Sequence, residues 1–88
     1  MFRVVWLQTA LNELAVVWTQ ADAQKRAAIT ASTNRLDHLL QTDPLQQGES
    51  RLPGQRIAFQ LPLGLIFEVH EQTGVVRVLH VWLIGKRS

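Results

Sequence analysis

Cysteine and tyrosine are both absent from this chain of 88 residues. Without cysteine, neither a disulfide framework nor a thiolate metal site is available. The three histidines lack the helical spacing that a zinc site favours, and no glycine-rich phosphate loop follows a strand. We therefore expect neither a metal ion nor another cofactor.

Long apolar runs are absent as well. The longest, residues 61–67, is far too short to cross a bilayer. Residues 1–18 are interrupted by Gln8, Asn12 and Glu13, and no small-residue cleavage site follows them, which argues against a signal peptide. With 47% hydrophobic and 18% charged residues, the composition is typical of a folded chain. We expect one cytoplasmic domain, residues 1–88, that does not contact a membrane.

The charge is slightly positive and unevenly distributed. Residues 1–44 carry four basic and four acidic side chains, whereas residues 45–88 carry five basic and three acidic ones. Lys86 and Arg87 contribute to this excess near the end of the chain. The pattern indicates a polyanionic partner only mildly, because two terminal cations also serve as a solubilising end.

The first half of the chain predicts a strand followed by two helices. Residues 2–7 alternate in the manner of a short strand, and Thr9 is a candidate N-cap for the first helix. Asp22 is a candidate N-cap for the second, which we expect to end at Asp43-Pro44. The expected apolar stripes are Leu11, Leu14, Ala15 and Trp18 on the first helix, and Ala28, Ile29, Leu36, Leu39 and Leu40 on the second. Residues 45–55, rich in Gly, Pro and Gln, predict a loop.

Residues 56–84 predict a three-stranded antiparallel meander. The triplets 62–64 and 72–74 both end in glycine, which suits three-residue hairpin loops whose last residue has positive φ. This register places Phe59 opposite Phe67 and Phe67 opposite Leu79 on an apolar face, with Arg77 at its edge. The other face would carry Arg56, Gln60, Glu68, His70, His80 and Trp82.

Two amphipathic helices and a sheet with one apolar face favour a two-layer α+β domain. We expect the order β-α-α-β-β-β, with the two N-terminal helices packed on one face of an antiparallel sheet. The polar face would then remain open.

This order, together with individual residues, resembles the RelE/ParE family of bacterial toxins from toxin–antitoxin operons. The matching features are Val5-Trp6, Ala10, Leu14, Pro44, the loop 48–51, the strand 65–69 and the strand 75–82. The resemblance covers nearly the whole chain and depends on the combination of these features.

The resemblance implies a toxin that a cognate antitoxin neutralises. In the RelE branch the toxin cuts mRNA on the ribosome, so this chain would be a metal-independent endoribonuclease that inhibits translation. In the ParE branch the toxin inhibits DNA gyrase without being an enzyme. The chain departs from the RNase pattern in lacking tyrosine and in having Gly64 where many members have an arginine. A gyrase inhibitor and a catalytically decayed toxin therefore stay open. A homodimer is a separate open alternative.

The predicted polar face supplies the candidate catalytic residues Arg56, Glu68, His70 and His80. RNA cleavage without a metal requires a base, an acid and a cation near the phosphate, and histidine titrates near neutrality. Candidate RNA and phosphate contacts are Arg51, Trp82, Lys86 and Arg87. Glu68 has an alternative role in balancing Arg56 and Arg77, and Trp82 has one in contacting the antitoxin or the C-terminal tail.

Overall fold

The computed structural model describes residues 1–84 and has the expected two-layer α+β architecture. Two helices follow the first strand, and four further strands complete one sheet. The elements are β1 (Arg3–Trp6), α1 (Gln8–Thr19), α2 (Ala23–Thr42), a 3₁₀ turn η1 (Pro44–Gln46), β2 (Glu49–Leu52), β3 (Gln55–Gln60), β4 (Leu63–His70) and β5 (Val75–Leu83).

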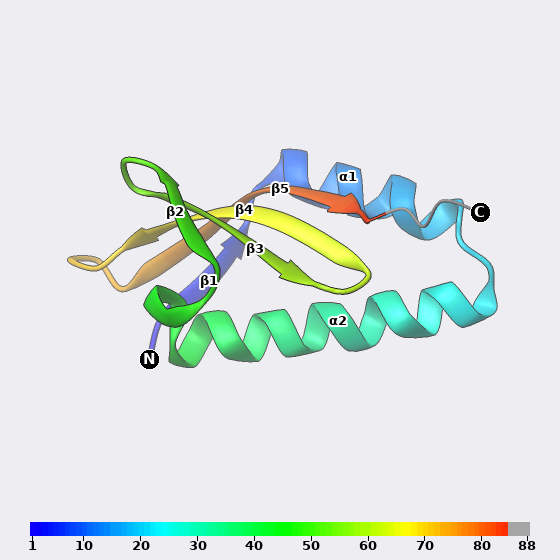
Figure 1. Cartoon of the computed structure of the whole chain (residues 1–88), viewed down its shortest axis with the longest axis horizontal. Helices are drawn as coiled ribbons and strands as arrows, with labels where there is room; N and C mark the ends of the chain where they lie inside the picture. Colours follow the sequence, from blue (N-terminus) through cyan, green and yellow to red (C-terminus); the bar gives the residue numbers. More distant parts are fainter. Residues whose placement is uncertain (85–88) are drawn as a thin grey trace.

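The sheet is mixed, with the strand order β1-β5-β4-β3-β2 (Figure 1). The strands β2 to β5 are antiparallel neighbours, whereas β1 is parallel to β5. The parallel pairing covers only Val75 to Val78 of β5. The second half of β5 is therefore an edge that β1 leaves free, and α1 runs beside this half.

The expected N-cap of α1 at Thr9 is wrong, because the helix already begins at Gln8. Its N-cap is Leu7, whose side chain makes no capping hydrogen bond. The Leu7 amide donates to the carbonyl of Val78, 3.0 Å away, so Leu7 stays extended beside β5. Pairing with the sheet thus determines where the helix begins.

The second helix follows the sequence prediction closely. The side chain of Asp22 accepts a hydrogen bond from the Lys25 amide at 2.8 Å, and the helix ends at Thr42 before Asp43-Pro44. Ile29, Leu36 and Leu40 are buried, although Ala28 is exposed. Neither helix of the described chain is long and apolar enough to span a membrane.

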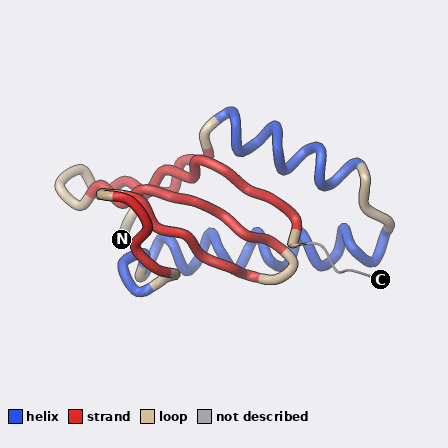
Figure 2. The backbone as a smooth tube through the Cα atoms, turned by 45° about the horizontal axis from the view of Figure 1, so that its top comes forward, coloured by secondary structure: helices blue, strands red, loops and turns tan. Residues whose placement is uncertain are grey.

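The helix α2 lies behind the sheet and covers one of its faces (Figure 2). We call this the covered face. It carries the buried side chains of Ala58, Leu63, Leu65, Phe67, Val76, Val78 and Val81, which form one core with Ala10 of α1 and the buried residues of α2. Ser32 of α2 also donates a 2.6 Å hydrogen bond to the carbonyl of Gln60, which ties the helix to β3.

The segment 45–55 was expected to be a loop, but it contains most of η1 and the strand β2. All four residues of β2 are exposed, and the strand pairs only with β3. A strand without a buried face has no apolar alternation for the sequence to reveal. The chain enters β2 through Gly48, which has a positive φ of 66°. A Cβ at this position would lie 2.1 Å from the carbonyl oxygen of Ile57.

The expected register of β3 against β4 is wrong. The turn is the two-residue Leu61-Pro62, and Gly64 is part of β4 and pairs with Phe59. Changing the turn length inverts the face of every β3 side chain relative to the prediction. Ala58 is therefore buried, whereas Phe59 is 61% exposed.

The second hairpin also differs, through a β-bulge in β5. His70 pairs with Val75, so the loop has four residues, 71–74, although Gly74 has the expected positive φ of 69°. The register then shifts between Ile66 and Phe67, and Phe67 pairs with Val78 rather than Leu79. Because of the four-residue loop, Arg77 lies opposite Glu68 and is not on the apolar face where we expected it.

Candidate functional site

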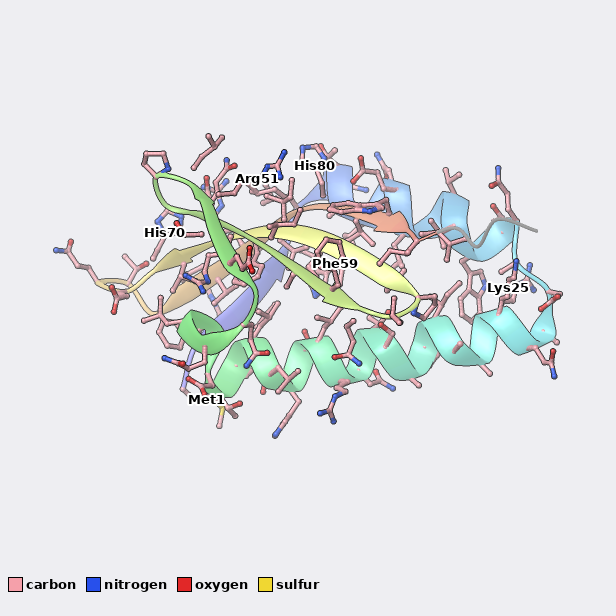
Figure 3. All side chains as sticks on the ribbon, in the orientation of Figure 1. Met1, Lys25, Arg51, Phe59, His70 and His80 are labelled. Atoms are coloured by element: carbon pink, nitrogen blue, oxygen red, sulfur yellow. The ribbon has the colours of Figure 1, made fainter. Side chains whose placement is uncertain are left out.

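The candidate site lies on the sheet face turned away from α2, which we call the open face. Three strands supply its side chains, because β3, β4 and β5 are adjacent in the sheet and alternate sides along their length. Its residues are Ile57, Phe59, Gly64, Ile66, Glu68, His70, Arg77, His80 and Trp82. The two histidines lie far apart on it, with His80 nearer α1 (Figure 3).

Glu68, His70 and Arg77 form one ionisable cluster on the open face. The Glu68 carboxylate is 3.0 Å from Nε2 of His70, two residues along the same strand. The same carboxylate oxygen is 3.7 Å from a guanidinium nitrogen of Arg77 on β5. The pairing of Glu68 with His70 follows directly from strand alternation, whereas the contact with Arg77 follows from the four-residue loop 71–74, which places Arg77 opposite Glu68.

His80 has a different carboxylate partner, Glu13 of α1. Nδ1 of His80 is 3.2 Å from Oε2 and 3.4 Å from Oε1 of Glu13. Oε1 also accepts a 3.0 Å hydrogen bond from the backbone amide of Val81. Glu13 thereby bonds to the edge of β5 that β1 leaves free and joins the helix to the open face.

Arg56 is not on the open face, so its predicted placement beside His70 is wrong. It pairs with Phe67 on the covered side of β3. Its guanidinium donates hydrogen bonds to the carbonyl oxygens of Gln47 and Gly48 at 2.9 and 3.0 Å. Arg56 therefore anchors the loop that leads into β2.

Trp82 lies over Gly64 and forms the aromatic part of the open face. A Cβ on Gly64 would lie 2.6 Å from two indole carbons of Trp82, so only glycine allows this close approach. The ring of Phe59 meets Trp82 edge-on, with centroids 6.3 Å apart and planes at 84°. Trp82 thus occupies the space above Gly64, the position at which the resemblance to the RelE/ParE family leads us to expect an arginine.

Of the remaining candidates, only Arg51 lies within the described residues. Arg51 is an exposed residue of β2, at the register shift between Ser50 and Leu52. Lys86 and Arg87 lie outside the described residues. Among residues 1–84 no three His, Cys, Asp or Glu side chains are grouped closely enough to hold a metal ion.

The sequence interpretation missed Glu13 and misplaced Arg77. Glu13 is 67 residues from His80 in the chain, and nothing in the helical pattern around it distinguishes it from a solvated acid. Arg77 was assigned to the wrong face by a register with a three-residue loop in place of the four residues 71–74.

Solved structures with the same arrangement of elements include proteins of toxin–antitoxin systems. A chain of the chromosomal ParDE TA system from P. aeruginosa superposes with a TM-score of 0.76 and 18% identity, over 97% of this chain and 98% of that chain. A chain of the toxin–antitoxin complex RelBE2 from Mycobacterium tuberculosis superposes with a TM-score of 0.72 and 19% identity, over 93% of this chain and 90% of that chain. The isolated E. coli RelE toxin superposes with a TM-score of 0.65 and 19% identity, over 100% of this chain and 88% of that chain.

These comparisons define the class of protein by its fold. Because one of the similar structures is a toxin alone, the toxin and not the antitoxin is the component that this chain resembles. The chain has the RelE/ParE toxin fold over its described length. No protein-family model and no curated protein sequence matches it significantly.

Proposed function

We propose that this protein is the toxin of a toxin–antitoxin pair and that it cleaves ribosome-bound mRNA without a metal ion. The observation that carries the proposal is the open face, where a RelE/ParE-type sheet displays two carboxylate–histidine pairs, Glu68–His70 and Glu13–His80. Both pairs are partly solvent-exposed and therefore accessible to a substrate.

The residue types match the chemistry of phosphodiester cleavage. A neutral histidine of one pair accepts the 2′-hydroxyl proton, and the leaving oxygen takes a proton from water. Arg77 and Arg51 provide positive charge for the phosphate, and Trp82 offers an indole on which an unpaired base stacks. Arg56 contributes indirectly, because it holds the carbonyls of Gln47 and Gly48 at the entry to the strand that carries Arg51. Lys86 and Arg87 are proposed as further phosphate contacts.

The cognate antitoxin is the proposed protein partner, by analogy with the complexes formed by the structurally similar toxins. A groove of about 390 Å³ between α1 and α2 offers it an apolar surface, lined by Leu11, Leu14, Ala15, Trp18, Thr19, Ile29, Thr30, Thr33 and Asn34. Leu11 and Trp18 on its rim are 43% and 38% exposed. Arg26 stacks over the Trp18 ring at 5.4 Å and donates to the Trp18 carbonyl, which holds the two helices in place around the groove.

A second candidate function, gyrase inhibition or a decayed toxin, is favoured by the position of Trp82. The indole fills the space above Gly64 where an arginine is common in RNase members, and this makes the centre of the open face apolar. An apolar surface suits a protein target better than a phosphate backbone.

Induced expression in a bacterial host tests the proposal. We expect growth arrest with newly formed mRNA 5′ ends within coding regions, and relief when His70 and His80 are both replaced by alanine. His38→Ala, in an exposed position of α2, is the matched control and should leave toxicity unchanged.

Growth arrest with intact mRNA, accompanied by gyrase in pull-downs of the protein, would select the gyrase inhibitor. Normal growth of the expressing cells, with the protein folded and present, would select the decayed toxin.

A further inference from the structure

The Glu13 carboxylate is held in a fixed position by two groups of β5. Oε1 accepts the Val81 amide proton at 3.0 Å, and Oε2 approaches Nδ1 of His80 at 3.2 Å. The Val81 amide lies beyond the part of β5 that pairs with β1, so Glu13 takes the place of a neighbouring strand as acceptor. Because the Val81 amide is part of the backbone, it fixes the position of the Glu13 carboxylate more firmly than a mobile side-chain donor would.

An ionised carboxylate has no proton to donate, so a nitrogen that bonds to it must carry a hydrogen. Nδ1 of His80 is therefore the donor to Glu13, and in the neutral ring Nε2 is left with a free lone pair. His70 has the reverse arrangement, because its Nε2 faces Glu68. In their neutral forms, the two histidines of the open face would therefore be opposite tautomers, Nδ1–H in His80 and Nε2–H in His70.

We propose that Glu13 is a positioning residue, which keeps neutral His80 in the Nδ1–H tautomer so that Nε2 serves as the general base. This inference rests on the proposed RNA cleavage and names the residue that prepares its base. Glu68, which bonds to His70 and faces the Arg77 cation, has no corresponding contact with His80 in the described structure.

In the cleavage step, the 2′-hydroxyl of the substrate gives its proton to Nε2 of His80. The 2′-oxygen forms a bond to phosphorus, the bond from phosphorus to the 5′-oxygen breaks, and that oxygen takes a proton from water. The products are a 2′,3′-cyclic phosphate and a 5′-hydroxyl. Glu13 remains ionised and stabilises the imidazolium that forms on His80.

Glu13→Gln is the decisive variant, because glutamine keeps the size of the side chain but has only one oxygen. The fixed Val81 amide takes that oxygen, which turns the NH₂ group toward Nδ1 of His80. Nδ1 must then accept a hydrogen bond, and the ring proton moves to Nε2. The substitution therefore exchanges the tautomer of His80 while retaining the contact with β5.

Nitrogen-15 NMR of the histidine side chains, at a pH where the rings are neutral, measures this directly. We expect His80 to be Nδ1–H in the wild type and Nε2–H in Glu13→Gln. The matched control, Glu68→Gln, should leave His80 unchanged. A wild-type His80 protonated at Nε2, or an unchanged tautomer in Glu13→Gln with the Val81 amide still protected from exchange, would overturn the proposal.

Cleavage of RNA on ribosomes is the second readout. Glu13→Gln should lower the rate of cleavage by about 10²-fold or more, the usual contribution of a general base, with little change in KM. Retention of the wild-type rate after the tautomer has changed would rule out Nε2 as the base. If the tautomer changes as expected but the wild type cleaves no RNA, Glu13 positions His80 and the proposed function is wrong.

Discussion

Each face of the sheet carries a phenylalanine, but the two rings have opposite surroundings. Phe67 on the covered face is completely buried, whereas Phe59, on the neighbouring strand but on the open face, is 61% exposed. The covered face is closed by α2 and carries only apolar side chains in its buried set. The open face combines the aromatic pair Phe59–Trp82 with two carboxylate–histidine pairs.

The difference between the faces separates the residues that stabilise the fold from those of the proposed site. Burial of apolar area stabilises the fold at roughly 25 cal/mol per Å², so the covered face contributes most of the free energy of unfolding. Side chains of the open face contribute little to folding, because exposed ion pairs are worth about 0–1 kcal/mol. Substitutions there can change binding or chemistry while the fold persists.

Phe67→Ala should have the largest effect. Removing a fully buried phenyl ring from the core leaves a cavity and is expected to lower the free energy of unfolding by about 3–5 kcal/mol. Urea denaturation followed by tryptophan fluorescence measures the loss. A change below about 1 kcal/mol would show that the covered face is not the main source of stability.

Gly64→Ala should have an intermediate effect, although its side chain would point to the open face. The new methyl group would lie 2.6 Å from the indole of Trp82, and displacing the ring is expected to cost about 1–3 kcal/mol. In a Trp82→Ala background the same substitution should cost much less, which a double-mutant cycle measures. An equal penalty in both backgrounds would mean that the indole is not the obstacle.

Phe59→Ala should have the smallest effect of the three. The substitution matches Phe67→Ala in chemistry but removes an exposed ring, so we expect a loss of about 0.5–1.5 kcal/mol from the edge-on contact with Trp82. The same urea titration provides the comparison. A loss as large as that of Phe67→Ala would contradict the assignment of the two phenylalanines to opposite faces.

The sequence predicted the helices and the meander well, but it assigned β3 to the wrong face. Apolar residues at positions 57, 59 and 61 alternate as those of a buried strand do, yet the small Ala58 is the residue that faces α2. Pro62-Leu63-Gly64 resembled a glycine-terminated turn, whereas the turn is Leu61-Pro62 and Gly64 belongs to β4. The glycine is required by the indole of Trp82 and not by a positive φ.

The candidate site was predicted in part. Glu68 beside His70, and His80 and Trp82 on the same face, follow from alternation along single strands and were expected correctly. The placement of Arg56 failed with the register of β3, and that of Arg77 failed with the length of the loop 71–74. Glu13 could not be foreseen, since its contact with His80 depends on how α1 lies along β5.

By itself, the sequence determined the order of the elements apart from η1 and β2, the cap at Asp22, the end of α2 before Pro44 and the positive φ at Gly74. These features depend on neighbouring residues, and local backbone chemistry is sufficient to specify them. Only the tertiary structure decided which side chains of different strands share a face and which carboxylate contacts His80. The physical reason is that a change of one residue in a turn or bulge inverts a strand, and packing against distant elements selects between the alternatives.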